Sequence, residues 1–207
     1  MSFDPISYKL LSFDIYGTLI NWEEGIYGSL LPLLSKLPSS SPHHPSNNTP
    51  SQTRHFLLSE YTKLEQSIQK EEPTLTYPLV LTKIYTQLAA SLSIPITSEE
   101  ATTFGSTIGS WPAFPDTVLA MQKLSKYYKL VVLSNVDKSS FSRTLSGPLS
   151  GVHFDAIYTA EDIGSYKPDL KNFAYLVENA EKGFGVKKEE ILKVAQSLFH
   201  GMLNIPL

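Results

Sequence analysis

The residue best suited to chemistry in this sequence is an aspartate, Asp14, which ends an apolar run and enters a turn. Residues 8–13 are short and apolar enough for a buried strand, where a carboxylate is costly unless it has partners or a function. Gly17 permits a tight turn after that strand, and Thr18 adds a hydroxyl beside the carboxylate. A strand-end aspartate can also simply cap a loop, so this segment alone leaves both interpretations open.

Two more groups of polar residues follow later apolar strands. Ser134 and Asn135 end the strand expected over 129–135, and Lys167 follows the strand expected at 156–159. The carboxyl ends of parallel strands form the binding edge of an open α/β sheet. There an ammonium keeps a carboxylate ionised, while hydroxyl and amide groups can hold an anion. Each feature alone is ordinary, but their order on successive strand ends favours a site with Asp14 as nucleophile.

The elements expected around these residues alternate between strands and helices. Helical spacing runs over 22–37, 54–71, 77–92, 97–108, 116–127, 138–149 and 169–182, and a last apolar strand covers 191–195. Strands that alternate with helices indicate an α/β fold with a parallel sheet and right-handed crossovers. The mostly helical block between the first strand and Pro115 is then an insertion, which we expect to cap the strand ends.

This pattern predicts two domains. Residues 1–20 and 114–207 form the α/β core, and residues 21–113 form the helical cap. Within the cap, a Pro- and Ser-rich stretch at about 38–53 has too little apolar content to offset its ordering entropy, so we expect a flexible loop. His43 and His44 lie in this loop, where we expect solvated side chains rather than metal ligands.

Composition narrows the classes of function. The chain has 207 residues, a formal net charge of −3 and no cysteine, which argues against a nucleic-acid footprint, a disulfide framework or a thiolate site. Charged residues interrupt the N-terminal apolar run, and no later run approaches a membrane span. We therefore expect a cytoplasmic protein with no nucleic-acid or membrane partner; a homodimer is left open.

The ordered motifs resemble those of the haloacid dehalogenase superfamily of hydrolases. Residues 13–19 resemble its first motif, residues 132–135 its second, and residues 164–169 its third, with Lys167 as the motif lysine. The resemblance spans nearly the whole chain. It implies a Rossmann-like core whose helical cap is inserted directly after the first motif.

Tyr16 points to one branch of that superfamily. The phosphatases carry a second aspartate at this position, whereas a phenol cannot easily act as an acid near neutral pH. The segment resembles the metal-independent 2-haloacid dehalogenases, in which Asp14 would displace halide and water would hydrolyse the resulting ester. No cofactor is then expected; magnesium would be needed only by a phosphatase. The resemblance implies that Lys167 stabilises the charge around Asp14, and it assigns substrate binding to Tyr16, Thr18, Ser134, Asn135 and, as the cap arginine, Arg54.

The fourth motif departs from the family pattern. Gly201 stands where we expect an acidic residue, and the sequence ends six residues later, at Leu207. We therefore expect the final core strand to be missing and the strand at 191–195 to lie at a sheet edge, which favours dimerisation or aggregation unless residues 201–207 fold back over it. Two alternatives to a dehalogenase stay open: a phosphatase-like hydrolase of a small phosphorylated metabolite, and a non-catalytic remnant.

Overall fold

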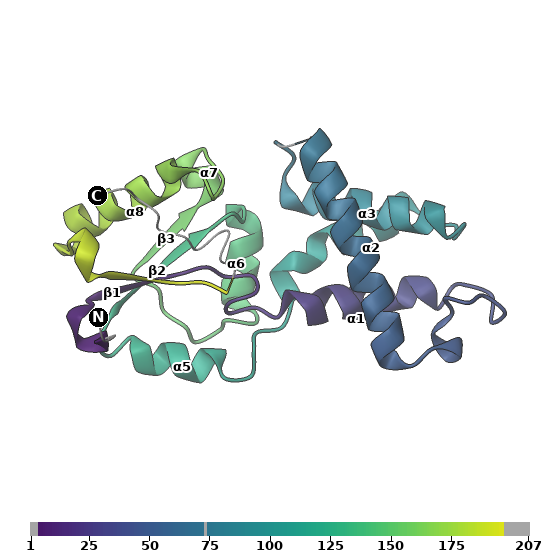
Figure 1. Cartoon of the computed structure of the whole chain (residues 1–207), viewed down its shortest axis with the longest axis horizontal. Coiled ribbons are helices and arrows are strands. Elements are labelled where there is room, and N and C mark those ends of the chain that lie inside the picture. The colour runs from purple at the N-terminus through teal and green to yellow at the C-terminus, as the bar shows by residue number, and fades with distance from the viewer. Residues whose placement is uncertain (1–3, 73, 197–207) are drawn as a thin grey trace. The chain divides into compact units, whose positions relative to one another are not determined.

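The computed structural model describes residues 4–72 and 74–196, which fold as two compact units (Figure 1). One unit joins the segment that ends at Asn21 to the segment that begins at Pro112. The other runs from Trp22 to Trp111. In the first unit, the Asn21 N–H donates to the Pro112 carbonyl over 2.8 Å, so its two segments are tied where they leave the unit.

The first unit contains a sheet of four parallel strands in the order β3-β2-β1-β4 among the described residues. The parallel α/β fold predicted from the sequence is thereby confirmed. Register places Ser12 between Val131 and Lys193, and β4 lies at one edge of the described sheet. The strands are β1 (Leu10–Phe13), β2 (Lys129–Ser134), β3 (Ala156–Thr159) and β4 (Ile191–Val194).

Helices cover both faces of this sheet, and Figure 1 shows α8 and α5 on opposite sides of it. Side chains alternate between the faces of a strand, so Leu10 and Leu11 point to opposite layers. The α8 side holds an apolar cluster in which Leu10 and Val131 pack with Phe173 and Leu176. The helices of this unit are α5 (Thr117–Leu124), α6 (Lys138–Ser146), α7 (Ala160–Ile163) and α8 (Leu170–Phe184), with 3₁₀ turns at Pro5–Ser7 and Lys188–Glu190.

The described residues of the second unit form helices, 3₁₀ turns and loops, with no strand. Its core is built from leucine and isoleucine side chains of α1, α2 and α3, among them Leu30, Leu57 and Ile84, which are fully buried. Its elements are α1 (Trp22–Leu34), α2 (Pro50–Glu71), α3 (Tyr77–Ser91) and α4 (Ser98–Gly105), with 3₁₀ turns at Pro45–Asn47 and Ser106–Ser110.

The predicted end of the loop at about residue 53 is wrong, because α2 already begins at Pro50. Thr49 and Gln52 form a reciprocal capping box, and proline is favoured at the first helical position. Upstream, the Asn47 amide donates to the Ser39 carbonyl over 2.7 Å, so the loop has hydrogen bonds of its own. Its flexibility stays a prediction.

Two glycines of α1 differ sharply in the space around them, and this difference gives a stability test. A Cβ added at Gly25 would lie 2.2 Å from the Trp111 ring, whereas one added at Gly28 would meet nothing within 4 Å. We expect Gly28→Ala to raise the free energy of unfolding by up to about 1 kcal/mol through helix propensity. Gly25→Ala should lower it by about 1–3 kcal/mol, because the indole must move.

Urea unfolding of both variants beside the wild type measures this difference. Equal effects of the two substitutions would show that Trp111 does not pack closely on α1.

Candidate active site

The first strand delivers Asp14 to the edge of the sheet and the chain then turns sharply. The Asp14 N–H donates to the Val194 carbonyl over 3.0 Å, which extends the ladder between β1 and β4 by one residue. Gly17 has a φ of +90°, a region that side chains with a Cβ rarely adopt. Its N–H donates to the Ile20 carbonyl over 2.8 Å, so the turn closes on itself beside the carboxylate.

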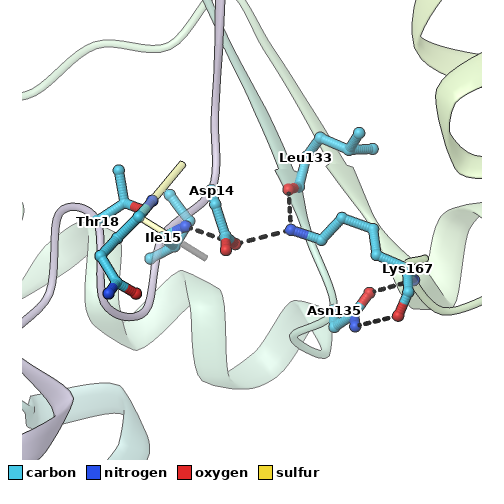
Figure 2. Close-up of polar contacts among 7 residues, drawn as sticks. Asp14, Ile15, Thr18, Leu133, Asn135 and Lys167 are labelled. Atoms are coloured by element: carbon cyan, nitrogen blue, oxygen red, sulfur yellow. Dashed lines mark hydrogen bonds and ion pairs between the residues drawn. The ribbon is translucent and has the colours of Figure 1, made fainter. Parts of the chain in front are cut away.

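Asp14 and Lys167 form a buried ion pair at this edge (Figure 2). The Lys167 Nζ lies 2.8 Å from Asp14 Oδ1, and the two residues are only 4% and 7% exposed. The Ile15 N–H also donates to Oδ1, over 2.9 Å. Oδ2 receives no hydrogen bond from the described residues, so its lone pairs are not engaged by them.

Lys167 is held at both its head and its backbone. Its Nζ donates to the Leu133 carbonyl over 2.9 Å as well as to Asp14. Burial lowers the pKa of the Lys167 amine, and the neighbouring Asp14 carboxylate opposes that effect. The pair therefore balances its own charge in a site that water cannot easily solvate.

Asn135 fixes the backbone of Lys167, as Figure 2 shows. Its Oδ1 accepts from the Lys167 N–H over 2.6 Å, and its Nδ2 donates to the Lys167 carbonyl over 3.0 Å. The structure thus gives Asn135 a positioning contact; its predicted contact with a substrate carboxylate stays a prediction. Ser134, the last residue of β2, is buried beside it.

Tyr16 and Thr18 lie on the turn after Asp14, and both have partners. The Tyr16 hydroxyl lies 2.9 Å from Thr144 Oγ1, which itself donates to the Ser140 carbonyl, so Tyr16 is the donor in this pair. Burial raises the pKa of Tyr16 to about 12, and the phenol therefore keeps its proton at neutral pH. Thr18 Oγ1 accepts from the Gln196 N–H over 2.9 Å, which ties the turn to the residues after β4.

Arg54 belongs to the second unit, on α2. Its guanidinium lies 2.6 Å from Glu24 and 3.7 Å from Glu23, and it stacks 5.3 Å over the Tyr27 ring. The hydrogen bond to Glu24 raises the pKa of Arg54 further. A halide would have to compete with these carboxylates, and the predicted halide role of Arg54 stays a prediction.

Sequence reasoning missed Lys193, which lies in the middle of β4. Its Nζ is buried and has no hydrogen-bond partner in the described structure. The available signal was a lysine inside an otherwise apolar strand, Ile191–Val194. Gly201 and the altered fourth motif lie outside the described residues.

The described residues contain no cluster of three or more histidine, aspartate and glutamate side chains that could hold a metal ion. They also contain no helix that is both long and apolar enough to cross a bilayer. Both findings concern residues 4–72 and 74–196, and the prediction of a metal-free site stays untested.

Comparison with known families agrees with this arrangement. The family model of the haloacid dehalogenase-like hydrolases matches residues 8–194. The chain belongs to this hydrolase family. The resemblance of its three motifs to the superfamily is thereby confirmed. A search of curated proteins gives no match.

Solved structures of this family share the fold at low sequence identity. An L-2-haloacid dehalogenase from Xanthobacter autotrophicus is 16% identical with a TM-score of 0.67, over 93% of this chain and 71% of that one. The L-2-haloacid dehalogenase PA0810 is 18% identical with a TM-score of 0.65, over 90% and 75%. The putative hydrolase YfnB from Bacillus subtilis, bound to magnesium, is 17% identical with a TM-score of 0.69, over 94% and 82%.

The contact between Asn135 and Lys167 can be tested without an assay of turnover. In Asn135→Asp an oxygen would face the Lys167 carbonyl in place of the amide donor. We expect the free energy of unfolding to fall by about 1–3 kcal/mol, since a buried acceptor loses its partner. Lys167 should also react faster with acetic anhydride, measured by mass spectrometry of its peptide.

Asn179→Asp provides the matched control. The Asn179 Nδ2 donates to the Tyr175 carbonyl over 2.8 Å on α8, away from Lys167. Equal labelling of Lys167 in the two variants would show that Asn135 does not position it.

Proposed function

We propose that this hydrolase is of the 2-haloacid dehalogenase type, with Asp14 as its nucleophile. The observation that carries the proposal is the buried pair of Asp14 and Lys167, in which both donors to the carboxylate reach Oδ1. The ammonium keeps the carboxylate ionised and directed, while Oδ2 keeps its lone pairs for attack. The position at the carboxyl ends of parallel strands is where α/β sheets bind their substrates.

The chemistry has two steps. Asp14 Oδ2 attacks the α-carbon of a short 2-haloacid, the carbon–halogen bond breaks, and halide leaves with the bonding electrons. Water then attacks Cγ of the aspartyl ester, and the bond between Cγ and the ester oxygen of the substrate breaks; one proton of the water goes to that departing oxygen and the other to solvent. The 2-hydroxyacid leaves, and Asp14 is regenerated with one oxygen from water.

Tyr16 supports this chemistry over leaving-group protonation. The buried phenol, with its pKa of about 12, donates to Thr144 and does not release its proton near neutral pH. A halide leaving group needs no proton, so the site does not require an acid at this position. In this proposal Lys167 stabilises the charge around Asp14, while Thr18, Ser134 and Asn135 would supply donors that hold the carboxylate of the substrate.

A phosphatase-like activity is the second candidate. It is favoured by one observation, the likeness of this fold to the magnesium-bound hydrolase from Bacillus subtilis. Such an enzyme would need oxygen ligands around the ion, and Tyr16 takes the place of the second aspartate. The two candidates differ in their need for magnesium.

The nucleophile can be tested by substitution and by isotope. Asp14→Asn keeps the shape but removes the attacking charge, so halide release from short 2-haloacids should fall by at least about 10³-fold. Single turnover in ¹⁸O-water should place the label in Asp14 before it appears in product. The control is Asp116→Asn, at an exposed aspartate of the same unit, which should leave turnover unchanged.

Label that appears directly in product, with Asp14 unlabelled, excludes a covalent intermediate. Absence of any turnover on haloacids and phosphate esters favours a non-catalytic remnant.

Metal dependence separates the two enzymatic candidates. We expect halide release to survive dialysis against EDTA, because displacement by Asp14 needs no Lewis acid. Activity is measured before and after dialysis, and again after magnesium is added back. If activity is lost on dialysis and returns only with magnesium, and if phosphate esters are turned over, the protein is a phosphatase and the dehalogenase proposal is wrong.

A further inference from the structure

Two neighbouring polar atoms in the sheet have no hydrogen-bond partner in the described structure. They are the Lys193 Nζ on β4 and the Ser12 Oγ on β1, and both are buried. Register places Ser12 directly beside Lys193 in the parallel pair. Burial of an amine without a hydrogen-bond partner costs folding free energy, and this cost must be offset elsewhere or serve a function.

Lys193 lies on the same face of the sheet as Asp14. Ser12 and Asp14 are two residues apart on one extended segment, so their side chains leave the sheet on the same side. Lys193 shares that side with Ser12 because paired residues of parallel strands point the same way. Lys193 therefore lies on the neighbouring strand, paired with the residue two positions before Asp14, the proposed nucleophile.

The charges that act on Lys193 come from the active site. Asp14 and Lys167 are the charged groups that influence its amine, whereas α7 and α8 present apolar side chains such as Ile163 and Phe173 to this face. Burial, aided by the Lys167 ammonium and opposed by the Asp14 carboxylate, lowers the pKa of Lys193 to about 7. One carboxylate faces two amines, so only one ammonium can be balanced.

We propose that Lys193 is a positioning residue of the active site, whose proton sets the net charge around Asp14. The charge cluster consists of Asp14, Lys167 and Lys193. With Lys193 neutral, the ion pair of Asp14 and Lys167 is balanced and Oδ2 is free to attack. With Lys193 protonated, a second positive charge withdraws electron density from Asp14 and attracts an anionic substrate.

The catalytic part of this inference rests on the proposed function and predicts that kcat and KM rise together as Lys193 loses its proton. Since Lys193 loses its proton near pH 7, kcat should rise up to about tenfold from pH 6 to pH 8, and KM for the anionic substrate should rise with it. Lys193→Met mimics the neutral amine and should hold kcat high across this range. Lys193→Arg keeps the positive charge and should hold kcat low.

The charge cluster itself is tested by NMR on protein labelled with ¹³C/¹⁵N-lysine, which needs no turnover. The Lys193 signal, assigned by its loss in Lys193→Met, should titrate near neutrality. Its midpoint should move to higher pH in Lys167→Met, which removes a repulsive charge. It should move to lower pH in Asp14→Asn, which removes an attractive one.

Lys129→Met is the control, because Lys129 lies on β2 but is half exposed and pairs with Asp155. It should leave the Lys193 midpoint unchanged. Thermal unfolding at pH 6 should show Lys193→Met more stable than the wild type, since it removes a buried ammonium; this also confirms that the variant folds.

The outcomes separate this inference from the proposed function. A Lys193 midpoint near 10.5, or one that ignores both Asp14 and Lys167, overturns the charge cluster whether or not the protein is active. A coupled titration with identical pH profiles of kcat in the wild type and Lys193→Met overturns the positioning role. A coupled titration without turnover on any haloacid overturns the proposed function and leaves the charge cluster standing.

Discussion

The site depends on the burial of one negative charge at the end of β1. Asp14 can occupy this position because an ammonium from a residue 153 positions later in the chain reaches it over 2.8 Å. Two buried charges lose most of their hydration, and the loss is offset only where the geometry is close and the remaining protons find acceptors. Here the Leu133 carbonyl accepts a hydrogen bond from the Lys167 ammonium, and Asn135 holds the backbone of Lys167 in place.

Much of the first unit serves to bring Asp14 and Lys167 together and to hold them in place. The parallel sheet brings the ends of β1 and β2 together, and Lys167 is supplied by the segment between α7 and α8. The turn after Asp14 closes through Gly17 and is tied to Gln196 beyond β4 by Thr18. Each contact holds backbone rather than substrate, so the carboxylate is oriented before any ligand arrives. Such preorganisation is what the proposed nucleophilic role of Asp14 requires.

The sheet and the main site were accessible from the sequence because their signals are local and repeated. Three apolar strands are followed by polar residues: Asp14, Ser134 and, after a short segment, Lys167. This pattern predicts a parallel sheet and the edge at which a binding site is expected. The start of α2 at Pro50 was missed because composition outweighed the capping box of Thr49 and Gln52. The short α7 carries too few residues for a helical period.

Other features depend on contacts that no local pattern shows. The hydrogen bonds between Asn135 and Lys167 join residues 32 positions apart, so Asn135 is seen in the sequence only as a polar strand end. The position of the Lys193 amine, which has no hydrogen-bond partner in the described structure, depends on β1, the strand beside β4 in the described sheet. A lysine in a short apolar strand is ordinary at the edge of a sheet, where β4 lies in the described structure, and only register places Lys193 beside Ser12.

The contact between Gly25 and Trp111 has a consequence for how this protein can change over evolutionary time. These residues lie near the first and last positions of the helical unit, so the insertion is closed at its own base. The host unit is closed at the same junction, through the bridge between Ile20 and Ala113. A segment whose ends meet can be exchanged for another of different length without altering the chain around it. Recombination at this junction can therefore supply a new helical unit while the sheet and its ion pair are inherited intact.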